Sequence, residues 1–370
     1  MQVSDLAALN TQVLSAAFVL STLFGAILQR THFCTMGAIS DVVNIGDWTR
    51  LRQWGLAIGV AMAGFALMAY AGIIDPSKTL YASHRWIWLS ALSGGVMFGF
   101  GMVLASGCGS KTLVRVGSGS LKSLVVLVVM GLAAFATLKG ITAVVRVATV
   151  DQVAIEFSTI ASLPYLLGAA FGIKPIVIGL VLGLALGCAL VVWALTGPEF
   201  CRVDNLLAGF GVGAIIVTMW WVSGHLGFVA EHPETLNEVF LATNSGRMEA
   251  LSFVSPVAYT LDWLMFFSDK SKVLTLGIVS VVGVMAGSCV VALWRRTFRW
   301  EGFGGTEDVA NHLVGGVLMG IGGVTAMGCT IGQGLTGVST LGATSFVVLA
   351  AIVAGAVAAF KYQMWRLDGR

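Results

Sequence analysis

Nine apolar stretches, each close to the length of a membrane-crossing helix, recur from one end of this chain to the other. A transmembrane helix needs roughly 20 predominantly apolar residues. The stretches that approach this length are 11–29, 53–74, 87–107, 119–138, 176–196, 205–223, 273–294, 309–328 and 341–360. Two further apolar pieces, near 157–173 and 251–267, are shorter or flanked by polar residues and are candidates for re-entrant or interfacial helices. The sequence therefore predicts an all-α integral membrane protein.

The composition favours the same class of protein. Charged residues make up 11% of the chain and the mean hydropathy is +0.91, whereas a soluble domain is about 25% charged. Because the apolar runs continue throughout, we expect a single polytopic membrane domain over 1–370 rather than a soluble domain with one anchor. The opening residues lack the positive region of a cleaved signal peptide, so the first span is expected to be retained.

The composition and motifs also exclude several partners and cofactors. The net charge of +3 is small and the basic residues are scattered along the loops, so the sequence predicts no nucleic-acid partner. None of the six cysteines forms a CxxC pair, and no Cys/His spacing matches a zinc site. We therefore expect neither a metal nor a cofactor, and a lipid bilayer as the surroundings.

The charges of the loops predict how the chain is oriented in the membrane, because cytoplasmic loops carry an excess of Lys and Arg. Basic residues gather in 294–300 and 361–370, whereas 231–249 is rich in glutamate. Nine spans then place the N-terminus outside and the C-terminus inside. Lys139 and Arg146 fall on the outer side against this rule.

Part of the chain repeats itself. Gly94–Ser118 aligns with Gly315–Ser339 at a constant offset of 221 without gaps, and ten of the 25 positions are identical. On the orientation above, the two copies cross the membrane in opposite directions. Such inverted repeats are common in secondary transporters, which bind the substrate where the repeats meet. We therefore expect half-repeats of about 1–150 and about 165–370.

Each copy of the repeat contains a glycine-rich break around a cysteine. The first break holds Gly107, Cys108 and Gly109, and the second holds Gly328 and Cys329. Glycine-rich backbone frees N–H groups that bind anions, and a following helix adds the positive end of its dipole. Non-helical backbone survives at membrane depth only where protein buries it or where it lines a polar cavity. The breaks are therefore the predicted anion site.

Further side chains accompany the breaks. Lys111 and Arg115 follow the first, and Thr330 and Gln333 follow the second. The cations either attract an anion or extend to the membrane surface, and Gln333 either donates to a ligand or satisfies broken helix backbone. A thiol is soft and a weak donor, so the paired cysteines, with Cys34 as a third, suggest a ligand with a soft sulfur or selenium atom.

Several of these motifs resemble the YeeE/YedE family of bacterial membrane transporters, in particular the YeeE-type thiosulfate uptake proteins. The similar segments are "HFCTMGAISD", "GGVMFGFGMVLASGCGSKTLVRVGSGSLKSL", "CRVDNLLAGFGVG" and "NHLVGGVLMGIGGVTAMGCTIGQGLTGVSTLG". The resemblance implies an hourglass-shaped fold with internal pseudo-symmetry. It also implies that thiosulfate passes a central line of cysteines, here Cys34, Cys108 and Cys329, and that a small cytoplasmic sulfur carrier of the TusA type receives it.

The function expected is thus uptake of thiosulfate for sulfur assimilation, without enzymatic activity. Two alternatives stay open: transport of another sulfur or selenium species, and a membrane thiol oxidoreductase or sulfurtransferase, in which a cation-activated cysteine attacks the substrate. The predicted substrate-binding residues are Cys34, Cys108, Cys329, Gly107, Gly109, Gly328, Thr330, Gln333, Lys111 and Arg115.

Overall fold

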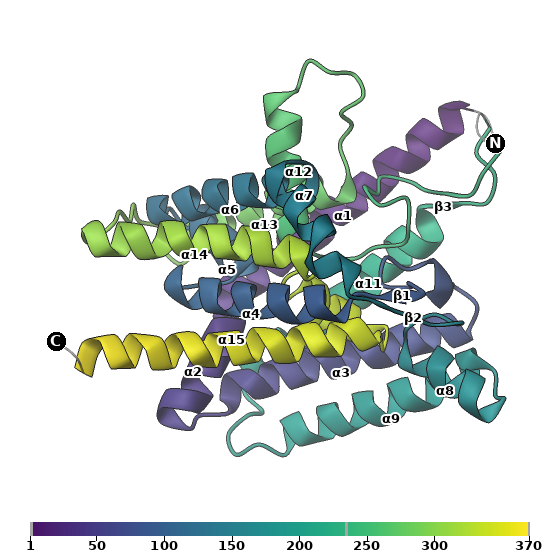
Figure 1. Cartoon of the computed structure of the whole chain (residues 1–370), viewed down its shortest axis with the longest axis horizontal. Coiled ribbons are helices and arrows are strands. Elements are labelled where there is room, and N and C mark those ends of the chain that lie inside the picture. Colours follow the sequence, from purple (N-terminus) through teal and green to yellow (C-terminus); the bar gives the residue numbers. More distant parts are fainter. Residues whose placement is uncertain (1–2, 234–235, 369–370) are drawn as a thin grey trace.

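The protein is a bundle of long helices that run roughly parallel to one axis (Figure 1). The computed structural model describes residues 3–233 and 236–368. The helices longest in this bundle are α1 (Val3–Thr31), α3 (Thr49–Tyr70), α4 (Trp88–Leu104), α6 (Leu121–Lys139), α9 (Pro175–Leu195), α13 (Leu276–Trp294), α14 (Thr306–Thr325) and α15 (Ala343–Asp368). The shorter α-helices are α2 (Thr35–Ile45), α5 (Gly109–Gly117), α7 (Ile141–Ala148), α8 (Leu163–Phe171), α10 (Val203–Leu206), α11 (Val212–Trp221) and α12 (Val254–Met265).

Other regular structure is confined to short pieces. Three π-helical segments interrupt or extend helices: η3 (Leu207–Gly211), η4 (Val222–Leu226) and η5 (Gly332–Gly337). Two 3₁₀ turns are η1 (Pro76–Lys78) and η2 (Val150–Gln152). Two antiparallel two-stranded ribbons pair β1 (Arg85–Trp86) with β2 (Ile155–Glu156), and β3 (Phe228–Val229) with β4 (Val239–Phe240). The all-α class is thereby confirmed for the described residues.

Eight segments within the described residues are long and apolar enough to cross a membrane, one fewer than the nine expected. They are Asp5–Ile45, Thr49–Tyr70, Trp88–Gly117, Leu121–Lys139, Pro175–Leu195, Val203–Leu226, Leu276–Trp294 and Ala343–Arg366. The ninth expected stretch, 309–328, corresponds to α14, which packs along α4 and α6. It falls outside the eight because Glu307, Asp308 and His312 lie in its first turns and its second half is rich in glycine.

The two shorter apolar pieces form short helices, α8 and α12. Each is too short to span a bilayer, because an α-helix rises about 1.5 Å per residue. Helix α12 packs against α6 and α13, and α8 packs against α9. They therefore pack against longer helices rather than adding spans.

Helices α4 and α14 cross in an antiparallel sense at their glycines. A Cβ atom at Gly94 would lie 2.7 Å from the carbonyl oxygen of Gly322, and one at Gly101 would lie 2.8 Å from that of Gly315. Gly315 and Gly322 are the equivalents of Gly94 and Gly101 at the offset of 221. Gly94 thus contacts the equivalent of Gly101, and Gly101 contacts the equivalent of Gly94. Only glycine allows two helices to approach this closely.

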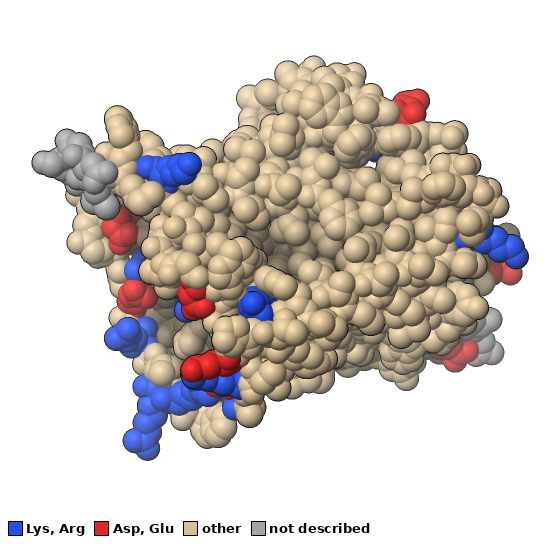
Figure 2. Space-filling view, turned by 90° about the horizontal axis from the view of Figure 1, so that it is seen from below, with Lys and Arg blue, Asp and Glu red and all other residues tan. Residues whose placement is uncertain are grey.

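Charged side chains gather at the two ends of the molecule (Figure 2). Between them, the face in this view is a band of uncharged surface, as expected for a belt of lipid. The N-terminus and the C-terminus lie at opposite ends of the bundle (Figure 1). Arg146, which contradicts the positive-inside rule, is paired with Asp151 at 3.4 Å, so its charge is largely compensated.

The core is aromatic around the middle of the bundle. Phe24 of α1 stacks on Phe253, with ring centroids 5.7 Å apart, and Phe65 of α3 meets Trp220 of α11 edge-on at 5.2 Å. All four side chains are less than a tenth exposed. These rings pack beside the second glycine-cysteine break, because Phe253 lies next to Cys329 and Trp220 donates a hydrogen bond to Ser339.

Candidate functional site

The two breaks predicted from the repeat have the same backbone conformation. Ser106 and Met327, which are equivalent at the offset of 221, adopt left-handed φ values of 57° and 58°. In each break the next glycine closes the end of the helix: Gly107 N–H donates to Met102 O and Gly328 N–H to Gly323 O, both at 2.8 Å. A left-handed residue that ends a helix in this way is a common helix C-cap. The breaks are therefore built alike in detail, not only in composition.

The same pattern occurs at a third cysteine. His32 ends α1 with a left-handed φ of 54°, and Cys34 two residues later begins α2. Cys201 also follows a left-handed residue by two positions, Glu199 at φ 56°, but its side chain is exposed. The sequence showed only a Phe-Cys similarity between these two places, because the left-handed residues are His and Glu rather than glycine.

Each of the three buried thiols lies at the N-terminus of a helical segment. The Sγ of Cys34 accepts the N–H of Gly37 at 3.5 Å, and the Sγ of Cys329 accepts that of Gly332 at 3.4 Å. Cys108 makes the corresponding contact with the backbone of Lys111, also three residues on. Helix N-termini carry partial positive charge, so all three thiols sit where an anion is favoured.

The fold brings the three thiols together. Cys34 and Cys108 lie within hydrogen-bonding distance of each other, and Cys329 lies close enough to Cys108 for their charges to interact. Their residues are 7%, 1% and 0% exposed, respectively. The three cysteines thus form one buried cluster, which we call the thiol waist, made from segments as far apart in sequence as α2 and η5.

Two hydroxyl groups in the thiol waist lack a hydrogen-bond partner among the residues that the structure describes. Thr35 and Thr330 each follow a waist cysteine directly. Their Oγ1 atoms are buried and lack a hydrogen-bond partner among the described residues, and Thr330 lies beside the thiol of Cys108. Because buried polar groups are normally satisfied, these hydroxyls mark a place for a ligand or water. Thr330 was predicted; Thr35 was missed, although both lie in a Cys-Thr dipeptide.

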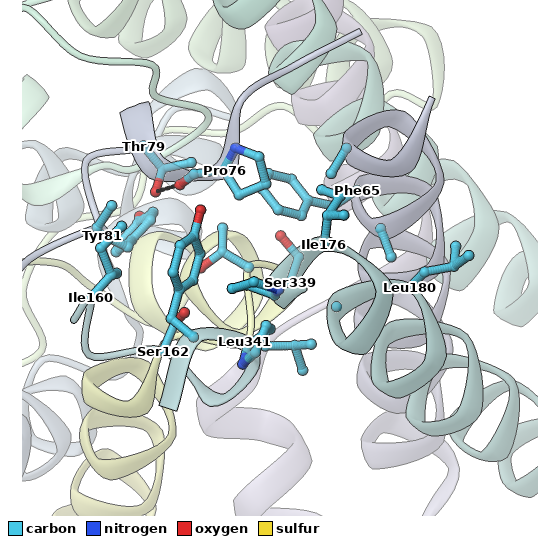
Figure 3. A pocket seen from close by; sticks show the side chains of 18 residues that line it. Phe65, Pro76, Thr79, Tyr81, Ile160, Ser162, Ile176, Leu180, Ser339 and Leu341 are labelled. Carbon is cyan, nitrogen blue, oxygen red and sulfur yellow. Dashed lines mark hydrogen bonds between the residues drawn. The ribbon is translucent and has the colours of Figure 1, made fainter. Parts of the chain in front are cut away.

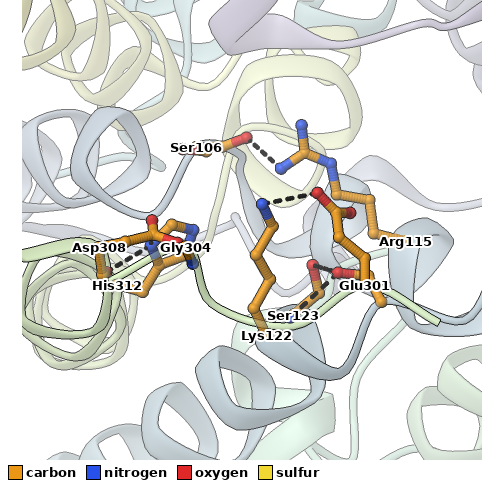
Figure 4. Close-up of polar contacts among 9 residues, drawn as sticks. Ser106, Arg115, Lys122, Ser123, Glu301, Gly304, Asp308 and His312 are labelled. Atoms are coloured by element: carbon orange, nitrogen blue, oxygen red, sulfur yellow. Dashed lines mark hydrogen bonds and ion pairs between the residues drawn. The ribbon is translucent and has the colours of Figure 1, made fainter. Parts of the chain in front are cut away.

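The two cations near the first break have different surroundings. Lys111 is half-buried and close enough to Cys34 and Cys108 to interact electrostatically with both. Arg115 instead donates from Nη1 to Ser106 O at 2.7 Å and faces a cluster around the Lys122–Glu301 ion pair (Figure 4). Lys111 thus belongs to the thiol waist, whereas Arg115 satisfies the carbonyl of the break.

Gln333 has the role of Arg115 in the second break, although it does not align with Arg115 in the repeat. Its Nε2 donates to Ala326 O at 3.0 Å and Met327 O at 3.1 Å, and its Oε1 accepts from Ser345 at 2.6 Å. Met327 is the equivalent of Ser106, so Gln333 and Arg115 satisfy the same carbonyl in the two breaks. This geometry supports the backbone-satisfying alternative for Gln333 over direct contact with a ligand.

The structural reason for glycine differs among the three predicted glycine positions. Gly328 has a φ of 156°, and a Cβ there would meet the side chain of Gln333 at 2.9 Å. At Gly107 a Cβ would lie 3.3 Å from the side chain of Lys111. At Gly109, which begins α5, it would find ordinary contact distances of 3.7 Å or more. Gly328 is therefore needed by the backbone itself, and Gly107 by the neighbouring lysine.

The remaining cysteines lie elsewhere. Cys188 and Cys201 are exposed and Cys289 is half-exposed, with all six thiols free. A narrow, mainly apolar pocket of about 40 Å³ lies behind the second break, between Tyr81, Phe65 and Ser339 (Figure 3). Tyr81 also donates to Gly332 O at 2.5 Å, so this pocket borders the thiol waist without containing a thiol.

Comparison with known proteins agrees with the arrangement of spans and cysteines. The profile of the family described as Sulphur transport matches residues 30–358. The chain is 27% identical over 324 residues to the thiosulfate transporter TsuA of Escherichia coli, covering 86% of each protein. It is 29% identical to the thiosulfate transporter TsuA of Spirochaeta thermophila, covering 88% of this chain and 91% of that one.

A shorter match extends the relationship. The probable transporter YedE of Escherichia coli is 29% identical over 110 residues, which is 30% of this chain and 26% of that protein. The range matched by the family profile includes all three waist cysteines. The protein with these three thiols at its broken helices is therefore a member of the sulphur transport family, which comprises the YeeE/YedE membrane proteins.

Proposed function

We propose that this protein takes up thiosulfate across the bacterial cytoplasmic membrane through the thiol waist, for sulfur assimilation. The observation that supports this most is the meeting of three helix N-termini, each with a buried thiol. Beside them are two hydroxyls that have no hydrogen-bond partner within the described parts of the chain. The N-termini favour the charge of the ion. The thiols offer weak, polarisable contacts to its terminal sulfur, and the hydroxyls donate to its oxygens.

The proposed mechanism is a relay of the ion from Cys329 to Cys108 to Cys34. Thiol contacts are weak, which suits conduction, because an ion must leave each site as easily as it binds. The waist residues are buried, so the ion passes only when the break segments move. η5, a π-helical segment, begins three residues after Cys329, and such segments often occur at functional sites in helices.

We further propose that the two breaks belong to inverted half-repeats of about 1–150 and about 165–370. The exchanged contacts of Gly94 with Gly322 and of Gly101 with Gly315 support a pseudo-two-fold axis between α4 and α14. A second pair of contacts also relates the two halves. Gly99 of α4 approaches Ile352 of α15, and Gly320 of α14, its equivalent, approaches Met130 of α6. On this arrangement the substrate site lies where the two halves meet.

The orientation proposed places the N-terminus outside and the C-terminus inside. The basic segments 294–300 and 361–370 then face the cytoplasm, and 231–249 faces outward. Cys34, the last thiol of the relay, lies two residues after His32, which is close enough to Arg50 and Arg295 to interact with their charges. A TusA-like carrier protein would receive sulfur at this end.

A thiol enzyme is the competing function, because Lys111 lies close to two of the thiols and a cation promotes the thiolate. Transport is favoured because the relatives that match most of the chain are named transporters. Radiolabelled thiosulfate uptake in cells without other sulfur importers tests the proposal, with excess sulfate, sulfite or selenite as competitors. Uptake that only thiosulfate blocks supports it. Transport of another ion instead would change the substrate, and no transport with a trapped protein persulfide would favour the enzyme.

A further inference from the structure

A second cavity lies next to the second break, on the side that faces outward in the proposed orientation, and Met327 and Ser252 are among its lining residues. It has a volume of about 220 Å³, room for several waters or a small hydrated anion. We call it the vestibule. The residues that line it include Tyr81, Arg146 of α7, Glu249, Ser252, Tyr259 of α12 and Met327.

The floor of the vestibule is continuous with the second break. Ser252 packs so closely that a Cβ at Gly332 would lie 2.6 Å from its Oγ. Gly332 in turn donates to Cys329 Sγ at 3.4 Å and accepts from Tyr81 at 2.5 Å. Met327 stands two residues before Cys329. An anion in the vestibule is therefore one layer of side chains away from the first thiol of the relay.

Among the described residues that line the vestibule, Arg146 and Glu249 are the two with charge. Arg146 is paired with Asp151, and its Nε is buried without a hydrogen-bond partner among the described residues. An orphaned guanidinium N–H in a cavity is suited to an oxyanion. Glu249 in the same cavity works against a dianion when it is ionised, because like charges at this range repel strongly in a low-dielectric site.

Hydrogen bonds hold the half-buried Glu249 at the vestibule. Its Oε2 accepts from Ser245 Oγ at 3.1 Å and its Oε1 from Asn244 N–H at 3.4 Å. Its own N–H donates to Ser223 Oγ at 3.0 Å. Three contacts from two segments thus fix both the backbone and the carboxyl.

We propose that Glu249 is a proton-controlled gate of the vestibule, which admits the dianion when the carboxyl is protonated and repels it when the carboxyl is ionised. This inference rests on the proposed uptake function. Glu249 would control by its charge whether the anion enters the outer cavity. The thiols would then recognise the soft sulfur atom of the ion.

The titration of Glu249 falls in the range that such a gate needs. Burial raises the pKa of the Glu249 carboxyl from its usual value of 4.5 to about 7. The pKa values of the facing Tyr81 and Tyr259 hydroxyls are also raised, by burial and then by nearby negative charges including Glu249, so both stay neutral. The gate is therefore open below about pH 7 and closes as the pH rises above it.

The remaining charged groups around Glu249 are engaged elsewhere. Arg247, two residues earlier, donates to Ala82 O at 2.6 Å. Asp262, beyond Tyr259 on α12, is paired with Lys272 at 2.6 Å. Glu249 is therefore left as the carboxyl of the vestibule whose pKa lies near neutrality.

The test is thiosulfate uptake into proteoliposomes that contain the full chain, with equal pH on both sides and thiosulfate below saturation. Because apparent affinity scales with the competent fraction, uptake by the unchanged protein should fall about tenfold from pH 6 to pH 8. Glu249→Gln should remove this dependence and keep the higher rate at pH 8. Glu238→Gln is the matched control: this exposed carboxylate in the same segment pairs with Lys78 and does not line the vestibule.

The outcomes separate the gate from the transport function. A flat profile in the Glu249→Gln protein, with the tenfold fall kept in Glu238→Gln, supports the gate. Uptake in both variants that falls with pH as in the unchanged protein overturns the gate and leaves uptake standing. No thiosulfate uptake by the unchanged protein at any pH overturns the proposed function and the gate together. If Glu249→Gln folds poorly, Glu249→Ala gives the same comparison.

Discussion

At the scale of single residues, the thiol waist combines one feature that the sequence reveals and one that it hides. Cys108 and Cys329 could be selected because they recur at the same place in a gap-free repeat. Thr35 escaped notice, because a hydroxyl next to a cysteine becomes informative only when its burial and missing partner are known. Gln333 was ambiguous for a related reason: its hydrogen-bond partners belong to backbone folded back from six and seven residues away.

The unpartnered hydroxyl of Thr330 gives a prediction at this scale. Thr330→Val keeps the shape but removes the donor, so thiosulfate uptake should fall about 10-fold or more, since a hydrogen bond to a charged group contributes about 1.5–3 kcal/mol. The thermal stability of the ligand-free protein should hold or rise, because a buried unsatisfied hydroxyl is removed. Thr330→Ser, which keeps the hydroxyl, should retain uptake. Full uptake by the valine variant would show that Thr330 does not bind the ion.

At the scale of helices, hydropathy was sufficient for the positions of the long elements and insufficient for their ends. The eight spanning segments coincide with eight of the nine expected stretches, because a lipid-facing helix must be apolar along its whole length. Helix α14 escaped the criterion because it is buried against α4 and α6, where glycine and polar first turns are tolerated. The left-handed ends at His32, Ser106 and Met327 were not predictable, since none is a glycine.

The close crossings of helices give a second prediction. A methyl group at Gly99 would overlap the carbonyl oxygen of Ile352 in α15. Gly99→Ala gains about 1 kcal/mol of helix propensity but overpacks a backbone that cannot move aside, which costs about 1–3 kcal/mol. We expect a lower melting temperature in detergent. Gly302→Ala, in a loop with no atom within 4 Å of the new Cβ, is the matched control and should melt unchanged. Equal melting of both variants would contradict the tight α4–α15 contact.

At the scale of the whole molecule, the placement of charge at both ends predicts which thiols are reachable from each side. Cys201 is exposed near Asp204, whose carboxylate pairs with Arg30 at the end of α1. In the proposed orientation a membrane-impermeant maleimide labels Cys201 in inside-out vesicles and not in intact spheroplasts. Glu231→Cys, in the outward-facing segment, should show the opposite pattern in a Cys188→Ser, Cys201→Ser background. Labelling of both positions from the same side would contradict the proposed topology. An exchange of the two labelling patterns would show that the orientation is reversed.

The most direct measurement is thiosulfate uptake by cells that carry Cys108→Ser or Cys329→Ser. Serine keeps a donor and caps a helix at least as well as cysteine, so membrane levels and melting temperature should hold while the soft contact to sulfur is lost. We predict uptake at least about tenfold below the unchanged protein for each variant. Cys188→Ser, an exposed cysteine outside the waist, should transport normally. Normal uptake by both waist variants would contradict the thiol relay.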